Sequence, residues 1–332
     1  MTRHSHCCLG PPPSKMTYPI IKGIIKDCLG SALHEELKEF ALADRALDKL
    51  WGAEQPTGFP RQMVSLFLYK SLTGFGYDKV LKQISFAFHL SAKSFHHNCK
   101  LLRRVFFRWG KKQIVNEGFE SWEKYSSFFP SKRNFPHINL AMDSSDFHLS
   151  SKQSTCCTEP SWSYKLCAPG QWYQLLSDAC GKVQKLWGGY SPKVYDGDWV
   201  KLCRWDLYDN FKGAKIVADT HYEKANEYLW LLPSDHDIHF THPIAAPRGR
   251  KRSRPEEFGD DPSHGLSTLT KQQQTHNKNV AHVHACVESP FGLIKLKWGD
   301  LGEVFREDSL EQDYLCFFAV GVHNYNIEHK CF

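Results

Sequence analysis

Apolar residues recur every three or four positions in the first third of the chain, and this period predicts amphipathic helices. The clearest stripe begins at Ser31 and comprises Leu33, Leu37, Phe40, Ala41 and Leu47. Two or three further helices are expected between residues 61 and 119. Residues 1–30 show little periodicity, so we expect a loose N-terminal tail there. The pattern therefore predicts a helical unit over residues 31–135.

From residue 136 the pattern changes to short apolar runs separated by Gly, Pro and Ser. Such runs are typical of β-strands joined by turns. They lie at residues 138–142, 162–166, 172–177, 183–188 and 215–218. The helix period returns at residues 280–294 and 309–326, after a polar stretch, residues 243–279, that is interpreted as an inserted loop. Strands followed by helices predict an α/β fold over residues 136–332.

Charge is distributed unevenly along the chain. The net charge is +6, but residues 1–140 carry 21 basic and 11 acidic side chains, whereas the remainder carries 21 and 25. The excess is concentrated in residues 61–133, which hold 14 basic and 4 acidic side chains. This segment is a candidate for binding a polyanion such as nucleic acid, although a solvated basic face has the same composition.

Composition and cysteine spacing exclude several classes of protein. A hydrophobic content of 41% and an aromatic content of 14% exclude global disorder. No apolar run approaches the ~20 residues of a membrane helix. Residues 1–10 lack the apolar stretch of a secretory signal, so we expect a soluble, intracellular protein. The 12 cysteines include no C-x-x-C pair, and in a reducing compartment we expect most of them to be small buried hydrophobes.

Three carboxylates are candidates for a metal site. Asp143 and Asp219 each follow a short apolar run, at the strand ends where α/β sheets commonly place catalytic groups. Glu288 interrupts the apolar spacing of the helix predicted at residues 280–294. Carboxylates from distant segments can bind Mg²⁺, and two such ions about 4 Å apart activate a water and stabilise the leaving oxygen in phosphodiester cleavage. An Asp after a strand is also a common turn residue or helix cap.

Five segments that occur in order carry a resemblance to a known family. They are INLAMDSSDFHL, LLSDACGKVQKLWGGYSPKVYDGDWVK, KIVADTHYEKANEYLWLLP, NKNVAHVHACVESPFGLIKLKW and GVHNYNIE. Residues 139–327 resemble the DDE endonuclease domain of Harbinger-type transposases, a group that is also similar to IS5-like bacterial enzymes. The resemblance implies an RNase H-like mixed sheet flanked by helices. It also implies that Asp143, Asp219 and Glu288 are the catalytic residues and hold two Mg²⁺ or Mn²⁺ ions.

The same resemblance implies a DNA transposase or transposase-derived endonuclease, which hydrolyses a phosphodiester at the element end and joins the freed 3′-OH to target DNA. Asp196 would be an auxiliary or structural acid. The chain departs from the family pattern at Ser144 and Ser145, and also at Ala218, His221 and His284. These departures leave open a domesticated DNA-binding or scaffold protein that no longer cleaves. A nuclease that acts on RNA is a further alternative.

A second metal arrangement competes for the same segment. His282, His284, Cys286 and Glu288 alternate, and on a strand they would share one face as a Zn²⁺ site. The apolar residues among them have helical spacing instead, which places His284 one turn from Glu288 as an auxiliary or structural residue. Pro290 removes a backbone donor, so this helix is expected to kink or begin nearby.

Residues 77–107 carry a helix-turn-helix pattern, and they resemble the region found ahead of such transposase domains. Ser91 is a good N-cap for the second helix, whose first turns would enter the major groove. The outward residues near DNA are Lys93, Ser94, His97 and Lys100. Closer to the phosphates we expect Arg103, Arg104, Arg108, Lys111 and Lys112. A helical bundle with a solvated basic face is the alternative.

A basic run lies within the predicted loop and comprises Arg248, Arg250, Lys251, Arg252 and Arg254. It is interpreted as a nuclear localisation signal, as an arm on the DNA backbone, or as a solvated loop. The expected partners are double-stranded DNA, further copies of the chain for synapsis, and a separate DNA-binding protein. The expected location is the nucleus, without membrane association.

Overall fold

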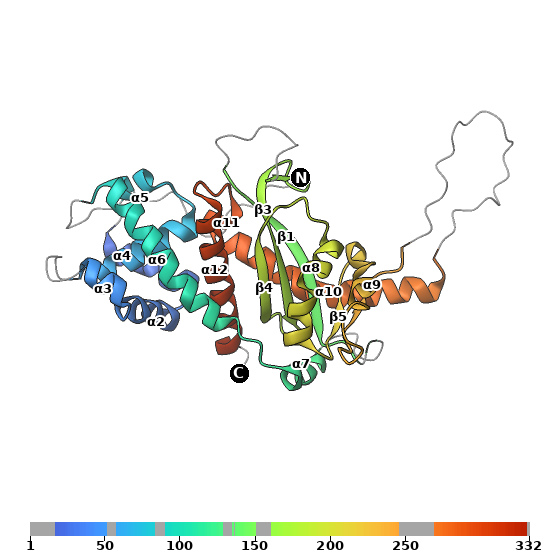
Figure 1. Ribbon diagram of the computed structural model, residues 1–332. Helices are drawn as coiled ribbons and strands as arrows, with labels where there is room; N and C mark the ends of the chain where they lie inside the picture. Colours follow the sequence, from blue (N-terminus) through green and yellow to red (C-terminus); the bar gives the residue numbers. More distant parts are fainter. Residues whose placement is uncertain are drawn as a thin grey trace, which may run out of the picture.

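The computed structural model describes residues 17–51, 58–83, 90–128, 135, 137–150, 161–245 and 269–330. A group of helices and a curled sheet lie side by side in it, and the last helix, α12 (Ser309–Lys330), runs between them (Figure 1). The combination of helices with a mixed sheet confirms the predicted α/β class.

One of the helices before the sheet, α1, lies in the segment expected to be a loose tail. The helices before the sheet are α1 (Tyr18–Leu29), α2 (Ser31–Leu42), α3 (Arg45–Trp51), α4 (Phe59–Thr73), α5 (Tyr77–Gln83), α6 (Ala92–Gln113) and α7 (Phe119–Ser126). Ile21, Ile25 and Leu29 of α1 are buried, because a spacing of four places them on one helix face. The prediction of a loose tail is therefore wrong for α1, while residues 1–16 lie outside the described part. The predicted stripe that follows is confirmed but is divided between α2 and α3.

The sheet combines an antiparallel half with a parallel half. Its strands are β1 (Leu140–His148), β2 (Trp162–Ser163), β3 (Ala168–Asp178), β4 (Val183–Tyr190), β5 (Lys215–Val217) and β6 (His239–Thr241). β4, β3 and β1 are antiparallel neighbours, β1, β5 and β6 are parallel, and β2 pairs with the beginning of β3. The predicted runs therefore contain strands. β6 was not predicted because its three residues are too few for an alternating pattern.

Helices cover both faces of this sheet. They are α8 (Asp196–Phe211), α9 (Ala225–Leu229), α10 (Lys271–Lys297) and α11 (Gly299–Gly302), with the 3₁₀ turn η1 (Thr220–Tyr222) before α9. Along β1, Met142 belongs to a buried cluster with Trp199 of α8, whereas Phe147 contacts Phe291 of α10 on the other face. Because α10 begins at Lys271, the inserted loop ends earlier than predicted; residues 246–268 lie outside the described part.

The close packing of α6 against α12 joins the helices to the sheet. The rings of Phe106 and Phe318 stack with their centroids 4.8 Å apart. Gly110 permits this approach, since a Cβ atom at that position would lie 2.4 Å from the carbonyl oxygen of Phe317. One buried cluster contains side chains of α1, α4, α6, α12, β1 and β3. The predicted boundary between residues 135 and 136 therefore does not separate two independent cores.

Asn324 fastens the other side of α12 to the sheet. Its Oδ1 accepts a hydrogen bond from the backbone N–H of Val183 at 2.8 Å, and its Nδ2 donates to the carbonyls of Val183 and Gln113 at 2.8 Å each. Val183 begins β4, which pairs only with β3 among the described strands. Asn324 thus satisfies backbone groups of an edge strand that would otherwise lack protein partners.

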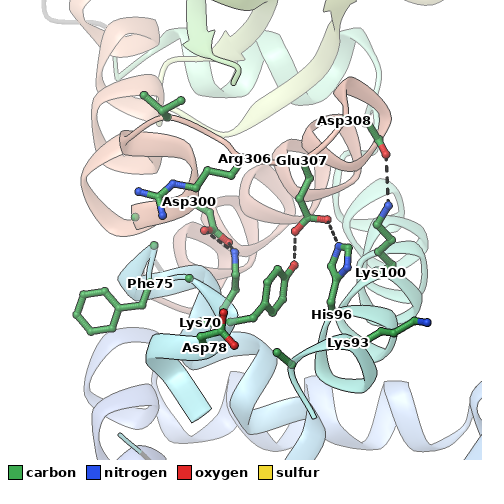
Figure 2. A pocket seen from close by; sticks show the side chains of 16 residues that line it. Lys70, Phe75, Asp78, Lys93, His96, Lys100, Asp300, Arg306, Glu307 and Asp308 are labelled. Atoms are coloured by element: carbon green, nitrogen blue, oxygen red, sulfur yellow. Dashed lines mark hydrogen bonds and ion pairs between the residues drawn. The ribbon is translucent and has the colours of Figure 1, made fainter. Parts of the chain in front are cut away.

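A buried arginine links α6 to the segment that leads into α12. The side chain of Arg103 is fully buried; its Nη2 lies 2.5 Å from Glu307 Oε1 and its Nη1 lies 3.1 Å from Glu311 Oε2. Burial acts to raise the pKa of Glu307, but the hydrogen bond and charge of Arg103 outweigh it and hold this pKa at about 2. Glu307 also accepts a hydrogen bond from Tyr77, and its Oε2 lies 3.1 Å from His96 Nε2, a contact that Figure 2 shows. The expectation that Arg103 lies close to DNA phosphates is therefore wrong, because its guanidinium is enclosed by carboxylates.

We expect Arg103→Ala to lower the free energy of unfolding by roughly 3–5 kcal/mol, because it leaves buried carboxylates without their cation. Arg104→Ala is the matched control: its side chain is exposed on the same helix, and its effect should stay within about 0.5 kcal/mol. Urea denaturation followed by circular dichroism measures both changes. Equal stability of the two variants would contradict a structural role for the Arg103 pair.

Candidate active site

Asp143 lies inside β1 rather than at its end. β1 continues to His148 and pairs with β3 along its whole length, so the apolar run that suggested a strand covers only its first residues. The polar residues from 143 to 146 remain in the strand because their backbone groups are paired with β3. The Asp143 side chain is 18% exposed. The expectation of a strand-end position is therefore wrong for Asp143.

Asp219 lies two residues beyond the end of the neighbouring parallel strand β5, at the same level as Asp143. Ala141 of β1 is paired with Val217 of β5, and each aspartate follows its member of that pair by two residues. Asp219 also caps η1, since its Oδ1 accepts a hydrogen bond from the backbone N–H of His221 at 2.8 Å. Both readings of this residue, strand-end carboxylate and cap, are therefore consistent with its position.

His284 links the third carboxylate to the first. On α10, its Nδ1 lies 3.2 Å from Glu288 Oε1, one helical turn further along. Its Nε2 lies 3.2 Å from the carbonyl oxygen of Met142 and 4.0 Å from Asp143 Oδ1. The Glu288 side chain is 63% exposed, whereas that of His284 is 8% exposed. α10 continues through Pro290, and this course brings Glu288 to the side of β1 that bears Asp143.

The pKa of Asp143 depends on its burial and on the charges of His284 and Asp219. Burial is the largest influence and raises this pKa to about 6; the charge of His284 lowers it, and that of Asp219 raises it. Asp143 and Asp219 therefore interact electrostatically across the two strands. A carboxyl group with this raised pKa lies in surroundings that do not compensate its negative charge fully.

Asp196 is the first residue of α8 and is buried. Its Oδ1 accepts a hydrogen bond from Trp172 Nε1 at 2.8 Å, and its Oδ2 lies 3.2 Å from Lys165 Nζ. Lys165 also donates to Ser144 Oγ at 3.3 Å, on the face of β1 that turns toward α8. Asp143 points toward α10 instead. Asp196 therefore lies in a cluster on the other face of β1 from Asp143, and its contacts are those of a structural acid.

Two lysines near the carboxylates have no sequence signal that distinguishes them. Lys165 lies in the turn between β2 and β3, and Lys295 lies near the end of α10. Lys295 Nζ donates to Ser145 Oγ at 2.6 Å and to the carbonyl of Asp146 at 2.9 Å. Only the pairing of β1 with β3 and the packing of α10 bring these cations to β1.

The helical form of α10 removes the strand arrangement on which the zinc alternative depends. His282 and Cys286 do not share the face of His284 and Glu288, and His282 is exposed. Among the residues that the structure describes, no group of three or more His, Cys, Asp or Glu side chains has the arrangement of a metal site. Asp143 and Glu288 thus both contact His284, and the charge of Asp219 acts on Asp143, but the three carboxylates do not form a closed set of ligands.

The predicted DNA-contacting residues fall on α6, except that residues 84–89 before it lie outside the described part. Ser91 caps α6 as predicted, because its side chain accepts from the backbone N–H of Ser94. One face of the helix, which we call the α6 basic stripe, carries Lys93, His97, Lys100, Arg104, Arg108 and Lys111. Their spacing of three or four residues extends over roughly 27 Å of helix.

The members of the α6 basic stripe differ in their exposure and in whether they form ion pairs. Lys93, His97, Arg104 and Lys111 are exposed, like Ser94 and Lys112 beside them. Lys100 pairs with Asp308 at 3.4 Å, and Arg108 pairs with Asp44. In Figure 2 the Lys93 side chain points away from the ion pairs around Glu307. The basic run from Arg248 to Arg254 lies outside the described residues.

None of the described helices is long and apolar enough to span a bilayer.

Comparison with known proteins adds one distant likeness. No protein-family model and no curated protein matches the chain. Among solved structures, it is similar to a piggyBac transposase in a cryo-EM synaptic complex with hairpin DNA, with a TM-score of 0.38 and 12% sequence identity. The match covers 94% of this chain and 76% of that chain. The function of this protein is therefore inferred from its own residues and contacts.

Because the pKa of Asp143 is raised, we expect Asp143→Asn to be more stable than wild type at neutral pH but not at acidic pH. Because the folded-state pKa of about 6 exceeds the ordinary value of 3.8, folding favours the protonated form. The favourable contribution of protonated Asp143 to the free energy of unfolding is complete below pH 3.8. It is lost as the pH rises through about 6. We expect the variant to match wild type near pH 4 and to be more stable by roughly 1–3 kcal/mol near pH 7.5, measured by denaturation in EDTA. A wild type that is the more stable protein near pH 7.5 would contradict this.

Proposed function

We propose that this chain is a metal-dependent DNA endonuclease of the DDE transposase type, or a protein derived from one. The observation that carries the proposal is the parallel register of β1 and β5, which brings Asp143 of β1 level with Asp219, two residues beyond the end of β5. α10 adds Glu288 through His284. The arrangement follows the predicted order of three carboxylates from distant parts of the chain. The mixed sheet with helices on both faces supports the RNase H-like interpretation.

The donor chemistry of these residues fits a hard divalent cation. Mg²⁺ and Mn²⁺ prefer carboxylate oxygens, and a cation would offset the charge that burial disfavours at Asp143. Asp143, Asp219 and Glu288 are the residues proposed to hold the ions. When bound, two ions would activate a water and stabilise the leaving oxygen of a phosphodiester. Glu288 is exposed and contacts His284, so it would exchange this contact for the metal ion when it acts as a ligand.

The rest of the chain supplies features that suit a DNA substrate. The α6 basic stripe offers phosphate contacts over more than one helical turn of protein, as binding to a DNA backbone requires. A helix-turn-helix arrangement of α5 and α6 is part of the proposal, with the start of α6 in the major groove. Strand transfer, assembly of several copies at the DNA ends, a separate DNA-binding partner and a nuclear location complete it as expectations from the family resemblance.

A second candidate function is DNA binding without cleavage, as in a domesticated copy. The specific observation that favours it is His284, whose imidazole lies between Asp143 and Glu288 where the two carboxylates could otherwise approach one ion together. The two candidates share the DNA-binding surface and differ only in the carboxylate site. Cleavage therefore distinguishes them.

We expect the full-length protein to nick double-stranded DNA that carries its terminal sequences in the presence of Mg²⁺ or Mn²⁺. Asp219→Ala should reduce the nicking rate by at least about a thousandfold, because a metal-binding carboxylate is lost. Asp27→Ala, an exposed aspartate of α1, is the matched control and should retain wild-type activity. A gel assay with end-labelled DNA and an RNA duplex of the same sequence measures both the rate and the preferred substrate.

The outcomes of this assay separate the candidates. Nicking that persists in Asp219→Ala would overturn the proposed triad. Tight DNA binding without cleavage in wild type would favour the domesticated protein. Faster cleavage of the RNA duplex than of the DNA would assign an RNA nuclease instead.

DNA affinity should depend on the exposed members of the α6 basic stripe. Removal of Lys93 and Arg104 in a double Ala variant should weaken binding about tenfold or more at moderate salt. It should also lower the slope of log affinity against log salt by about 2, since two phosphate contacts are lost. The double variant Lys26→Ala and Lys124→Ala removes the same charge from α1 and α7 and should change neither quantity. Fluorescence anisotropy over a salt series measures both; an unchanged slope in the α6 variant would exclude this surface.

A further inference from the structure

Four large apolar side chains are exposed along α8 and just after α9. The exposed fractions are 63% for Leu202, 49% for Trp205, 83% for Trp230 and 61% for Leu231. We call these four residues the α8–α9 patch. The two tryptophans alone present on the order of 300 Å² of ring surface to solvent. Isolated exposed apolar residues are ordinary, but a contiguous group of this size is typical of an interaction surface.

Hydrogen bonds at both ends of α8 show that the four side chains belong to one surface. Near the start of α8, Tyr228 donates to Asp198. Near its end, Tyr208 donates to Asp235 at 3.2 Å. The segment from 228 to 235 therefore runs alongside α8 from one end to the other, as Figure 1 shows for α8 and α9. Trp230 and Leu231 lie on that segment between the two bonds.

The helical spacing of α8 places its two members of the patch between the same bonds. Asp198, Leu202, Trp205 and Tyr208 follow one another at intervals of three or four residues, so they share one helix face. The bonds of Asp198 and Tyr208 turn this face toward the segment that carries Trp230. The patch is therefore contiguous across α8 and the segment after α9.

These side chains are exposed although the core beneath them is well packed. Leu207 of α8 and Leu229 and Leu232 beside Trp230 are buried in the cluster beneath the sheet. The same short segments thus bury one set of apolar residues and present another outward. Four outward apolar residues lower the solubility of the protein. They contribute favourable free energy only when another surface covers them.

The charges around the patch indicate which surface that is. Its rim comprises the charged side chains of residues 198–212 and 224–235 that are not buried, four basic and five acidic: Lys201, Arg204, Lys212, Lys224, Asp198, Asp206, Asp209, Glu227 and Asp235. A rim with a slight negative excess does not attract a polyanion, so nucleic acid is disfavoured as the occupant. A surface that carries both signs in nearly equal number is complementary to itself when a two-fold axis brings two copies together.

We infer that the α8–α9 patch is the interface through which this chain pairs with a second copy of itself. In such an isologous contact each copy buries Trp230 and Trp205 against the partner's patch, and basic rim residues of one copy face acidic ones of the other. Large aromatic side chains at the centre and charges at the rim match the anatomy of protein interfaces. The inference does not depend on nuclease activity, since the patch contains none of the candidate carboxylates.

The test compares the oligomeric state of three full-length proteins by sedimentation velocity over a range of micromolar concentrations. Wild type should form a dimer. The double variant Trp230→Ser and Leu231→Ser should raise the dissociation constant on the order of a hundredfold or more, because two central side chains are lost from each copy. Leu296→Ser is the matched control, since Leu296 of α10 is 67% exposed but lies outside the patch. It should leave the dimer unchanged.

Thermal denaturation of the same proteins keeps folding and association apart. The patch residues are exposed within one copy, so the double variant at low concentration should unfold at the temperature of dilute, monomeric wild type. A wild type that remains a monomer at about 100 μM would overturn the inference. So would a dimer that persists unweakened in the double variant, since its interface would then lie elsewhere. Loss of the dimer in Leu296→Ser alone would equally assign the interface to α10.

Discussion

The arrangement of the whole protein depends on the buried contact between α6 and α12. Arg103 supplies the only cation that directly contacts both Glu307 and Glu311 among the described residues, and the three groups are enclosed where α12 begins. Removing one member of such a set leaves charge in a medium that cannot solvate it. Further along the same two helices, Gly110 allows their backbones to approach closely. Helices from the N-terminal third and the final helix thus form one core that the sheet rests on.

This core determines how the candidate active site is held. Asn324 of α12 fixes the edge of the sheet, and α10 crosses the face of β1 that bears Asp143. The register of β1 with β5 then sets Asp143 level with Asp219, which lies two residues beyond the end of β5 and caps η1. Glu288 differs, because it stands on the exposed side of a helix and contacts β1 through His284. The site therefore combines one carboxylate within the sheet, one directly after a strand, and one on a helix that can exchange its contact.

Three surfaces with different chemistry are separated in space on this framework. The α6 basic stripe belongs to the helices before the sheet, and the carboxylates lie in β1, just after β5 and on α10. The α8–α9 patch lies on the solvent side of the helices that cover the opposite face of the sheet from α10. A polyanion, a divalent cation and a second copy of the chain can therefore be bound without competing for the same residues. The uneven charge of the sequence reflects this division, since its basic excess lies largely on α6.

Much of the fold could be predicted because hydrophobic spacing is a local property. The stripe from Leu33 to Leu47 and the period after Val280 predicted their helices, and the pattern of short apolar runs predicted five of the strands. The residues of the candidate site could be named because their types and order are local too. Tertiary structure alone decided that Arg103 is enclosed rather than presented to phosphate, since its partners lie some 200 residues away. It also decided that Asp143 lies within a strand, and that Lys165 and Lys295 adjoin it, because pairing between strands and packing of helices carry no mark in the neighbouring sequence.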